Sequence, residues 1–329
     1  KFILPFFVVN DRSWRLLSYE RDIKRKIEWP KIDLKEFMNL HLSETELKDT
    51  HSRITQSTDV HEIVEQTDVK KVKNGSIDLD PVFLARQLSD IIPNPWQAYE
   101  IGKSTIDGFL KKYPEKTVKN NFIFIIEELR KHLLAEEEHL AESVFHKLIH
   151  KGTLKFFIAG RDLGYLLPTT QKIPKTSRQL NRESGEYLYK SLFEHVPEAD
   201  LNQDEQRVAW YLDSQEKVLF WYRNMARRDY AIQGWKRNKI YPDFIFATHE
   251  AQGKLKTKVS NFNKVFVIET KGIHLKNEDS DYKSKVLDLC NELAKEVKWS
   301  ELEMSLSDYS LHYELLYTDQ WQNRLNELV

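Results

Sequence analysis

The sequence has almost no cysteine and no long apolar run. Cys290 is the single cysteine among 329 residues, which excludes an internal disulfide framework and a cysteine-based zinc cluster. A membrane span would need about 20 consecutive apolar residues, and a secretion signal would need a basic start followed by an apolar segment. Neither pattern is present, so we expect no membrane partner. The single cysteine predicts a reducing, cytoplasmic setting.

An excess of charge of one sign is also lacking. The chain has 50 Lys and Arg against 51 Asp and Glu, which gives a net charge of −1. A protein with this balance needs a local basic surface if it binds nucleic acid. The apolar share of 40% is enough for a core, and the length predicts two or three domains.

The glycine that a phosphate-binding loop requires is missing as well. Gly102-Lys103-Ser104 resembles the end of such a loop, but Gln97 occupies the position of its first glycine. We interpret this segment as a helical turn. An Asp-Glu-Ala-His box is not found either, so the sequence contains no recognisable ATP-driven motor.

Three regions of the chain differ in their residue patterns. Residues 1–78 are predicted to contain β-structure, beginning with two strands joined by a turn at Asn10-Asp11. Residues 79–185 are predicted to be largely helical. Residues 186–329 have the pattern of a third domain, in which helices and strands alternate.

The middle region carries clear helix signals. Asp80-Pro81 is typical of a helix start, because Asp caps the first turn and Pro suits its first position. Apolar spacing predicts further helices at about 100–112 and 118–150. A short strand is expected at 154–158.

The last region is predicted to form a mixed β-sheet with flanking helices. Its pattern indicates a helix from Asn202 to about Asp213, strands near 217–223, 228–233, 241–247 and 264–271, a helix at about 281–298, and a strand at 310–317. The order α-β-β-β-β-α-β is that of an α/β (α+β) fold. It is not the pattern of a doubly wound nucleotide-binding sheet.

Charged residues lie at the start of one of these strands and at the end of the next. Asp243 follows Pro242 at the start of one strand, and Glu269 and Lys271 end the next. Side chains alternate along a strand, so Glu269 and Lys271 point the same way with Cα atoms about 6.6 Å apart. A charge at the end of a buried strand is costly unless it is paired or bound to a metal.

This set of residues suits phosphodiester hydrolysis. Clustered carboxylates hold Mg²⁺, which prefers hard oxygen ligands, and the metal polarises a phosphate and acidifies bound water. A lysine beside them stabilises charge in the transition state. We therefore predict Asp243, Glu269 and Lys271 as catalytic residues, with Mg²⁺ as cofactor and Mn²⁺ as a substitute.

Glu205 is predicted as a third metal ligand and catalytic carboxylate. Three carboxylates and one lysine sum to −3 + 1 = −2, a charge that one divalent cation neutralises. Two alternatives stay open. Asn202 and Glu205 fit a helix capping box, and Glu269 with Lys271 fits an ion pair on an edge strand.

Basic and aromatic residues alternate just before Asp243. Between positions 217 and 241, seven Lys and Arg oppose Asp229 alone, a balance of 7 − 1 = +6. Lys and Arg bind phosphates and exposed aromatic rings stack on bases, although a core strand with solvated charges is the alternative. The predicted nucleic-acid-binding residues are Arg223, Arg227, Arg228, Gln233, Trp235, Lys236, Arg237 and Lys239. The aromatic residues interleaved with them are Trp221, Tyr222, Tyr230 and Trp235.

These motifs resemble the PD-(D/E)XK nuclease superfamily, and in particular the C-terminal endonuclease domain of type III restriction enzyme Res subunits and related helicase-nucleases. The similar runs are Glu205 to Asp213, Trp221 to Asn224, Gln233 to Trp235, Ile240 to Phe244 and Glu269 to Leu275.

The resemblance implies a restriction-endonuclease-like sheet and Mg²⁺-dependent DNA cleavage, with Asp243 and Glu269 as metal ligands and Lys271 as the catalytic lysine. It implies a role in cleaving foreign DNA, as in restriction-modification and phage defence. It also implies an ATP-dependent helicase or translocase motor, which these residues lack, and a methyltransferase subunit that recognises the target sequence. The start at Lys1 rather than Met suggests a piece of a longer protein, and simple loss of an initiator Met is the alternative.

Two other functions are open at the level of sequence. The domain could be a catalytically silent nuclease fold that binds DNA for a motor, or a nuclease directed at RNA.

Overall fold

The computed structural model describes residues 3–42, 78–159, 161–249, 264–272, 278–294 and 309–328. Most of the polar segment predicted between the strands near 241–247 and 264–271 lies outside these ranges, as do residues 295–298 of the predicted last helix.

The chain divides into two compact units. The first unit comprises residues 1–19 and 145–329, and the second comprises residues 20–144. The predicted boundaries at 78/79 and 185/186 do not coincide with this division. The reason is that the N-terminal strand pairs with strands from far along the chain, as described below.

The second unit is helical. Its helices are α1 (Pro81–Gln87), α2 (Pro95–Leu110), α3 (Glu115–Asn120) and α4 (Phe122–His150). Its short helical segments are η1 (Tyr19–Ile23), η2 (Lys24–Lys26), η3 (Trp29–Lys31) and η4 (Phe37–Asn39). Tyr19, and the residues of α4 from 145 onward, belong to the first unit.

The predicted helix start at Asp80-Pro81 is confirmed, because the Asp80 side chain accepts a hydrogen bond from the Val82 amide. The helix predicted at 100–112 begins earlier, at Pro95, where Asn94 caps it. Gly102-Lys103-Ser104 lies within this helix, as expected. The helix predicted at 118–150 is interrupted at Asn121 and is therefore two helices.

The first unit contains two β-sheets. The elements of the unit are β1 (Ile3–Asp11), β2 (Ser13–Leu16), β3 (Leu154–Phe157), η5 (Arg161–Leu163), β4 (Gly164–Leu166), η6 (Glu198–Asp200), α5 (Gln203–Ser214), β5 (Val218–Arg223), β6 (Phe244–Thr248), β7 (Lys264–Lys271), α6 (Glu278–Ala294), β8 (Ser310–Tyr317) and α8 (Trp321–Leu328). One sheet has β1 at its centre, paired antiparallel with β2, β3 and β4. The predicted N-terminal hairpin is thus confirmed.

The second sheet has the strand order β5-β6-β7-β8. Strands β5, β6 and β7 are antiparallel neighbours, and β8 is parallel to β7. The mixed α/β class predicted for this region is confirmed. A strand predicted at 228–233 is wrong: this segment forms only an isolated bridge between Ile232 and Ile240. The helix α8 was not predicted.

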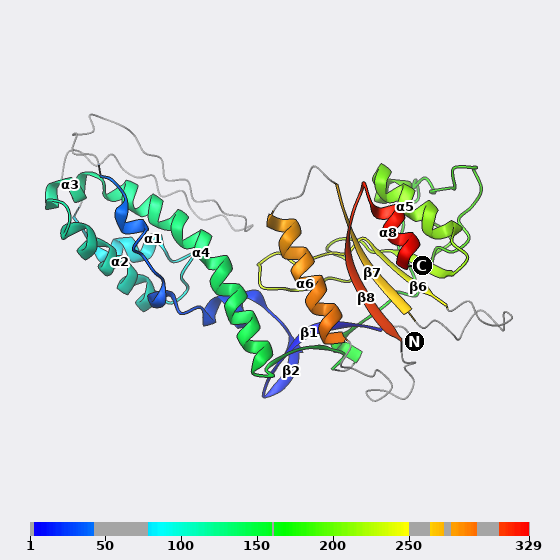
Figure 1. The fold of residues 1–329 in the computed structure, drawn as a ribbon, viewed down its shortest axis with the longest axis horizontal. Coiled ribbons are helices and arrows are strands. Elements are labelled where there is room, and N and C mark those ends of the chain that lie inside the picture. The colour runs from blue at the N-terminus through cyan, green and yellow to red at the C-terminus, as the bar shows by residue number, and fades with distance from the viewer. Residues whose placement is uncertain are drawn as a thin grey trace. The chain divides into compact units, whose positions relative to one another are not determined.

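Helices cover both faces of this sheet (Figure 1). On one face, α5 and α8 pack on a core that includes Phe246, Phe266 and Ile268. On the other face, α6 packs against β8, where the Asn291 side chain bonds both backbone groups of Tyr313. Successive side chains of β7 point to opposite faces of the sheet, so Val265, Val267 and Glu269 lie on the opposite side of the strand from Phe266 and Ile268.

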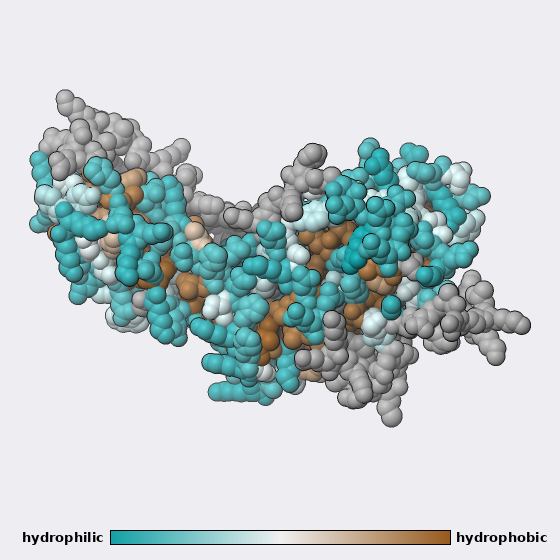
Figure 2. All heavy atoms as spheres, in the orientation of Figure 1, coloured by the Kyte–Doolittle hydropathy of each residue, from teal (hydrophilic) through white to brown (hydrophobic). Residues whose placement is uncertain are grey.

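Hydrophilic side chains predominate on the outer sides of the helices in Figure 2, and hydrophobic ones show between α6 and α8. In the part of the chain that the structure describes, no helix has the length and apolar character of a membrane span.

Candidate active site

Asp243 and Glu269 are brought together by the pairing of β6 with β7. The register places Phe244 opposite Ile268, and one step further along the two antiparallel strands places Asp243 opposite Glu269. The Asp243 amide donates to the Ile268 carbonyl at 2.7 Å. The two carboxylates therefore meet at the end of β7, as the sequence predicts.

Thr270 holds Asp243 in place. Its backbone amide and its hydroxyl both donate to Asp243 Oδ2, each at 2.7 Å. Two donors from one residue fix the orientation of the carboxylate. The other oxygen, Oδ1, accepts a hydrogen bond from Arg223.

The carboxylate of Glu269 is buried and only half satisfied. Its Oε1 accepts a bond of 2.7 Å from Lys283 Nζ, on α6. Its Oε2 is buried without a hydrogen-bond partner among the described residues. An unpaired buried carboxylate oxygen is costly, so it is a position where a cation would be strongly stabilised.

Burial raises the pKa of Glu269 to about 7, and the neighbouring negative charge of Asp243 contributes to this rise. Lys283 and Lys271 act in the opposite direction. The strand register places Asp243 opposite Glu269, so the two carboxylates repel each other when both are ionised, which is the arrangement that a divalent cation relieves.

Lys271 lies on the same side of β7 as Glu269 and is mostly buried, with 15% of its side chain exposed. Its Nζ donates to Asp279 Oδ2 at 3.2 Å. Asp279 also lies 3.6 Å from Lys283. Although burial raises the pKa of Asp279, Lys283 and Lys271 hold it below the usual value.

Glu205 reaches the site from α5, on the other face of the sheet. The predicted capping box is present: the Asn202 side chain accepts from the Glu205 amide, and Glu205 Oε2 accepts from the Asn202 amide. The other oxygen, Oε1, accepts a bond of 2.8 Å from Arg223. Burial raises the pKa of Glu205, Arg223 lowers it, and Asp243 adds to the rise.

The net charge of the site is less negative than the −2 expected from the sequence. The structure adds Arg223, Asp279 and Lys283 to the four residues counted there. Four carboxylates and three cationic side chains sum to −4 + 3 = −1. The protein itself therefore neutralises most of the acidic charge.

Within the described ranges, no group of three or more His, Cys, Asp or Glu side chains is arranged to hold a metal ion. Mg²⁺ commonly uses one or two carboxylates and keeps water or phosphate as its other ligands. Asp243 and Glu269 fit that smaller set of ligands, since Glu269 Oε2 has no partner in the described part of the chain. Glu205 is committed to Arg223 and to its helix cap, so the structure does not group it with them as a ligand.

The aromatic residues near the site are in the core, so the prediction that they stack on bases is wrong. Trp221, Tyr222, Tyr230 and Trp235 are between 0% and 3% exposed. Their spacing suits core packing as well as base stacking, and only the packing of distant segments decides between the two. Trp235, for example, packs against Phe145 and Tyr282.

The other predicted nucleic-acid-binding residues differ in how far they are exposed. Arg223 and Gln233 are engaged inside the fold: Arg223 pairs with carboxylates, and the Gln233 amide donates to the backbone of Gly234 and Lys236. Lys236 is half-buried, with its ammonium over the Tyr282 ring. The exposed residues are Arg227, Arg228, Arg237 and Lys239.

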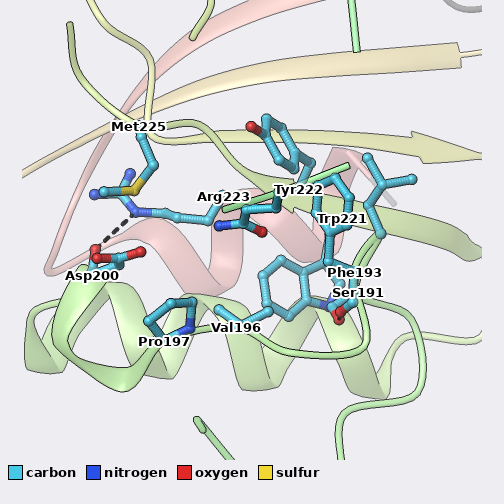
Figure 3. Close-up of a pocket in the computed structure, with 11 residues that line it drawn as sticks. Ser191, Phe193, Val196, Pro197, Asp200, Trp221, Tyr222, Arg223 and Met225 are labelled. Carbon is cyan, nitrogen blue, oxygen red and sulfur yellow. Dashed lines mark hydrogen bonds between the residues drawn. The ribbon is translucent and has the colours of Figure 1, made fainter. Parts of the chain in front are cut away.

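A small pocket lies beside the site (Figure 3). Arg223, Asp200 and Met225 are among its lining residues. Arg223 Nε donates to the Asp200 carbonyl at 3.4 Å, the contact drawn as a dashed line in Figure 3. The guanidinium thus lies between the pocket and the carboxylates.

Two members of the site, Asp279 and Lys283, were not predicted from the sequence. A signal for them exists: they stand four apart on the helix that follows β7, so both lie on one helical face. The sequence alone does not show that this face turns toward the end of β7, because that depends on how α6 packs on the sheet.

Comparison with family models finds no match, and neither the curated proteins nor the solved structures include a significant match to the chain.

Proposed function

We propose that the first unit is a divalent-metal-dependent DNA endonuclease, with Asp243 and Glu269 as metal ligands and Lys271 as the catalytic lysine. The observation that carries this proposal is the buried Glu269 carboxylate, whose Oε2 lacks a partner in the described chain while Asp243 lies beside it. The sheet with helices on both faces supports a restriction-endonuclease-like fold.

Bound Mg²⁺ would polarise a phosphate and lower the pKa of a coordinated water. The charge of the site suits this chemistry. The seven charged side chains sum to −4 + 3 = −1, and a divalent cation brings the sum to +1. That charge matches the single negative charge of a phosphodiester.

The chain's own residues prepare the ligands for this role. Thr270 orients Asp243 through Oδ2, and Lys283 holds Glu269 through Oε1, which leaves Oε2 for a cation. Asp279 holds the Lys271 ammonium near the end of β7. Lys271 is thereby positioned to stabilise negative charge that develops on a phosphate.

DNA binding is proposed to rest on phosphate contacts. The exposed cations Arg227, Arg228, Arg237 and Lys239 suit the backbone of a duplex. Since the nearby tryptophans and tyrosines are buried, base stacking has no part in this proposal.

The wider role is proposed from the resemblance to type III restriction enzymes. In that role the domain cleaves foreign DNA in the cytoplasm. An ATP-dependent motor moves the DNA, and a methyltransferase subunit recognises the target sequence.

The test is cleavage of plasmid DNA with Mg²⁺ or Mn²⁺ by the wild-type chain and by Asp243→Asn, which keeps the shape of the side chain. We expect the variant to lose about 100-fold or more of the rate. Asp204→Asn is the matched control, because Asp204 is an exposed carboxylate on α5. Wild-type rates in a folded Asp243→Asn chain would refute the assignment.

One observation favours a second function, the silent DNA-binding module. Arg223 and Lys283 already pair with all four carboxylates, so much of the acidic charge is balanced without a metal. DNA retardation in a gel, with no cleavage under Mg²⁺, Mn²⁺ or Ca²⁺, would support this function. Matched DNA and RNA substrates in the same assay distinguish the two nuclease specificities.

A further inference from the structure

Arg223 occupies the space between the two carboxylates that come from different faces of the sheet. Its Nη1 lies 2.7 Å from Asp243 Oδ1 and its Nη2 lies 2.8 Å from Glu205 Oε1. The Arg223 side chain is 14% exposed, and those of Glu205 and Asp243 are 11% and 15% exposed. A guanidinium in this mostly buried position acts as a cation held inside the protein.

Arg223 engages the Asp243 oxygen that Thr270 leaves available. Thr270 donates twice to Oδ2, so Oδ1 is the less occupied oxygen. Arg223 Nη1 donates to this oxygen and also to the Asp243 carbonyl at 2.9 Å. A divalent cation that coordinates Asp243 Oδ1 would therefore lie next to the Arg223 guanidinium, which is bonded to the same oxygen. Two positive charges this close repel each other strongly.

We propose that Arg223 is a positioning residue that serves as a built-in counter-ion, and that a divalent cation must displace its guanidinium from Asp243. Before the cation binds, Arg223 holds Asp243 and Glu205 in place without a metal. This inference rests on the proposed function, because it assumes that Asp243 is a metal ligand.

A backbone carbonyl beside the site offers the guanidinium an acceptor other than Asp243. Arg223 and Asp200 line the same pocket, and Arg223 Nε already donates to the Asp200 carbonyl (Figure 3). A shift toward this pocket would separate the guanidinium from Asp243 without unfolding β5. The bond to Glu205 need not break, because the two carboxylates are held by different nitrogens.

The test is calorimetric titration of Mn²⁺ into the metal-free full chain. We expect Arg223→Met to bind Mn²⁺ about tenfold or more tightly than the wild type, because a competing charge is removed. Arg223→Lys should bind with intermediate affinity, since one ammonium cannot reproduce the two-nitrogen bridge. Arg207→Met is the matched control: Arg207 also pairs with a carboxylate, Asp204, but is 61% exposed, and wild-type affinity is expected.

Thermal melting with and without Mn²⁺ keeps the test decisive if Arg223→Met is unstable. A variant that melts lower than wild type without metal, and gains more from Mn²⁺, supports the exchange. If the wild type binds Mn²⁺ and both Arg223 variants bind it equally or more weakly, this inference is overturned and the proposed function stands. Absence of Mn²⁺ binding by the wild type and by both variants would overturn the proposed function together with it.

Discussion

At the scale of single residues, the site is defined by what each carboxylate oxygen contacts. Asp243 is bonded through both oxygens, whereas Glu269 has one oxygen bonded to Lys283 and one without a partner in the described chain. Glu269 is also the residue for which burial raises the pKa to about 7. The ionised form of this side chain therefore destabilises the metal-free fold.

The pH dependence of stability follows from the raised pKa of Glu269. The unfolded chain loses this proton near pH 4.5 and the folded chain near pH 7, so the folded state binds more protons between these values. Stability of the metal-free chain should therefore fall as pH rises from about 4.5 to 7, by about 3 kcal/mol. Glu269→Gln should show a flatter profile. Urea unfolding in the presence of a chelator, from pH 5 to 8, measures the stability of the wild type and of the variant. An equally steep decline in Glu269→Gln would show that Glu269 is not the group responsible.

At the scale of elements, α5 does more than carry Glu205. Asp213, near its C-terminal end, is buried and accepts hydrogen bonds from Arg182 Nε at 2.8 Å, from the Lys190 amide at 2.8 Å and from Trp221 Nε1 at 3.1 Å. The segment that contains Lys190 in turn bonds to β5 through Trp221. Asp213 therefore joins the helix to the strand that positions Arg223.

Replacing Asp213 tests this connection. Asp213→Asn removes the charge and one acceptor oxygen, and it takes from Arg182 its carboxylate partner while leaving the Asp213 backbone carbonyl as an acceptor, so we expect a loss of about 3 kcal/mol in the free energy of unfolding. The fluorescence of buried Trp221 during urea unfolding of the full chain is a suitable probe. Asp204→Asn, on the exposed side of the same helix, should change stability by less than about 1 kcal/mol. Equal stabilities of the two variants would show that Asp213 does not have this role.

At the scale of the whole molecule, the two sheets of the first unit form one compact body. The Tyr230 hydroxyl donates to the Pro5 carbonyl at 2.7 Å, and the rings of Phe156 and Tyr313 lie 5.6 Å apart. Tyr230 and Tyr313 are both buried. The N-terminal strand β1 and the strand β3 therefore cover residues of the region that carries the candidate site.

A fragment of residues 186–329, the domain predicted from the sequence, should not fold stably by itself. It would expose Tyr230, Trp235 and Tyr313, each at most 2% exposed in the whole chain. Burying a side chain of this size contributes about 2 kcal/mol or more. Circular dichroism during heating should show no cooperative transition for the fragment and a sharp one for the whole chain. A fragment that melts like the whole chain would contradict the division into units.

Local patterns in the sequence determined the cap at Asp80, the cap at Asn202, the ends of β7 and the shared side of Glu269 and Lys271, because capping and strand alternation involve residues only a few positions apart. Tertiary structure decided the rest. It buried Trp235 instead of exposing it, placed Arg223 between two carboxylates, and brought Lys283 to Glu269. These contacts join segments far apart in the chain, and hydrophobic burial, which favours no particular pair of segments, gives no local signal of which segments will meet.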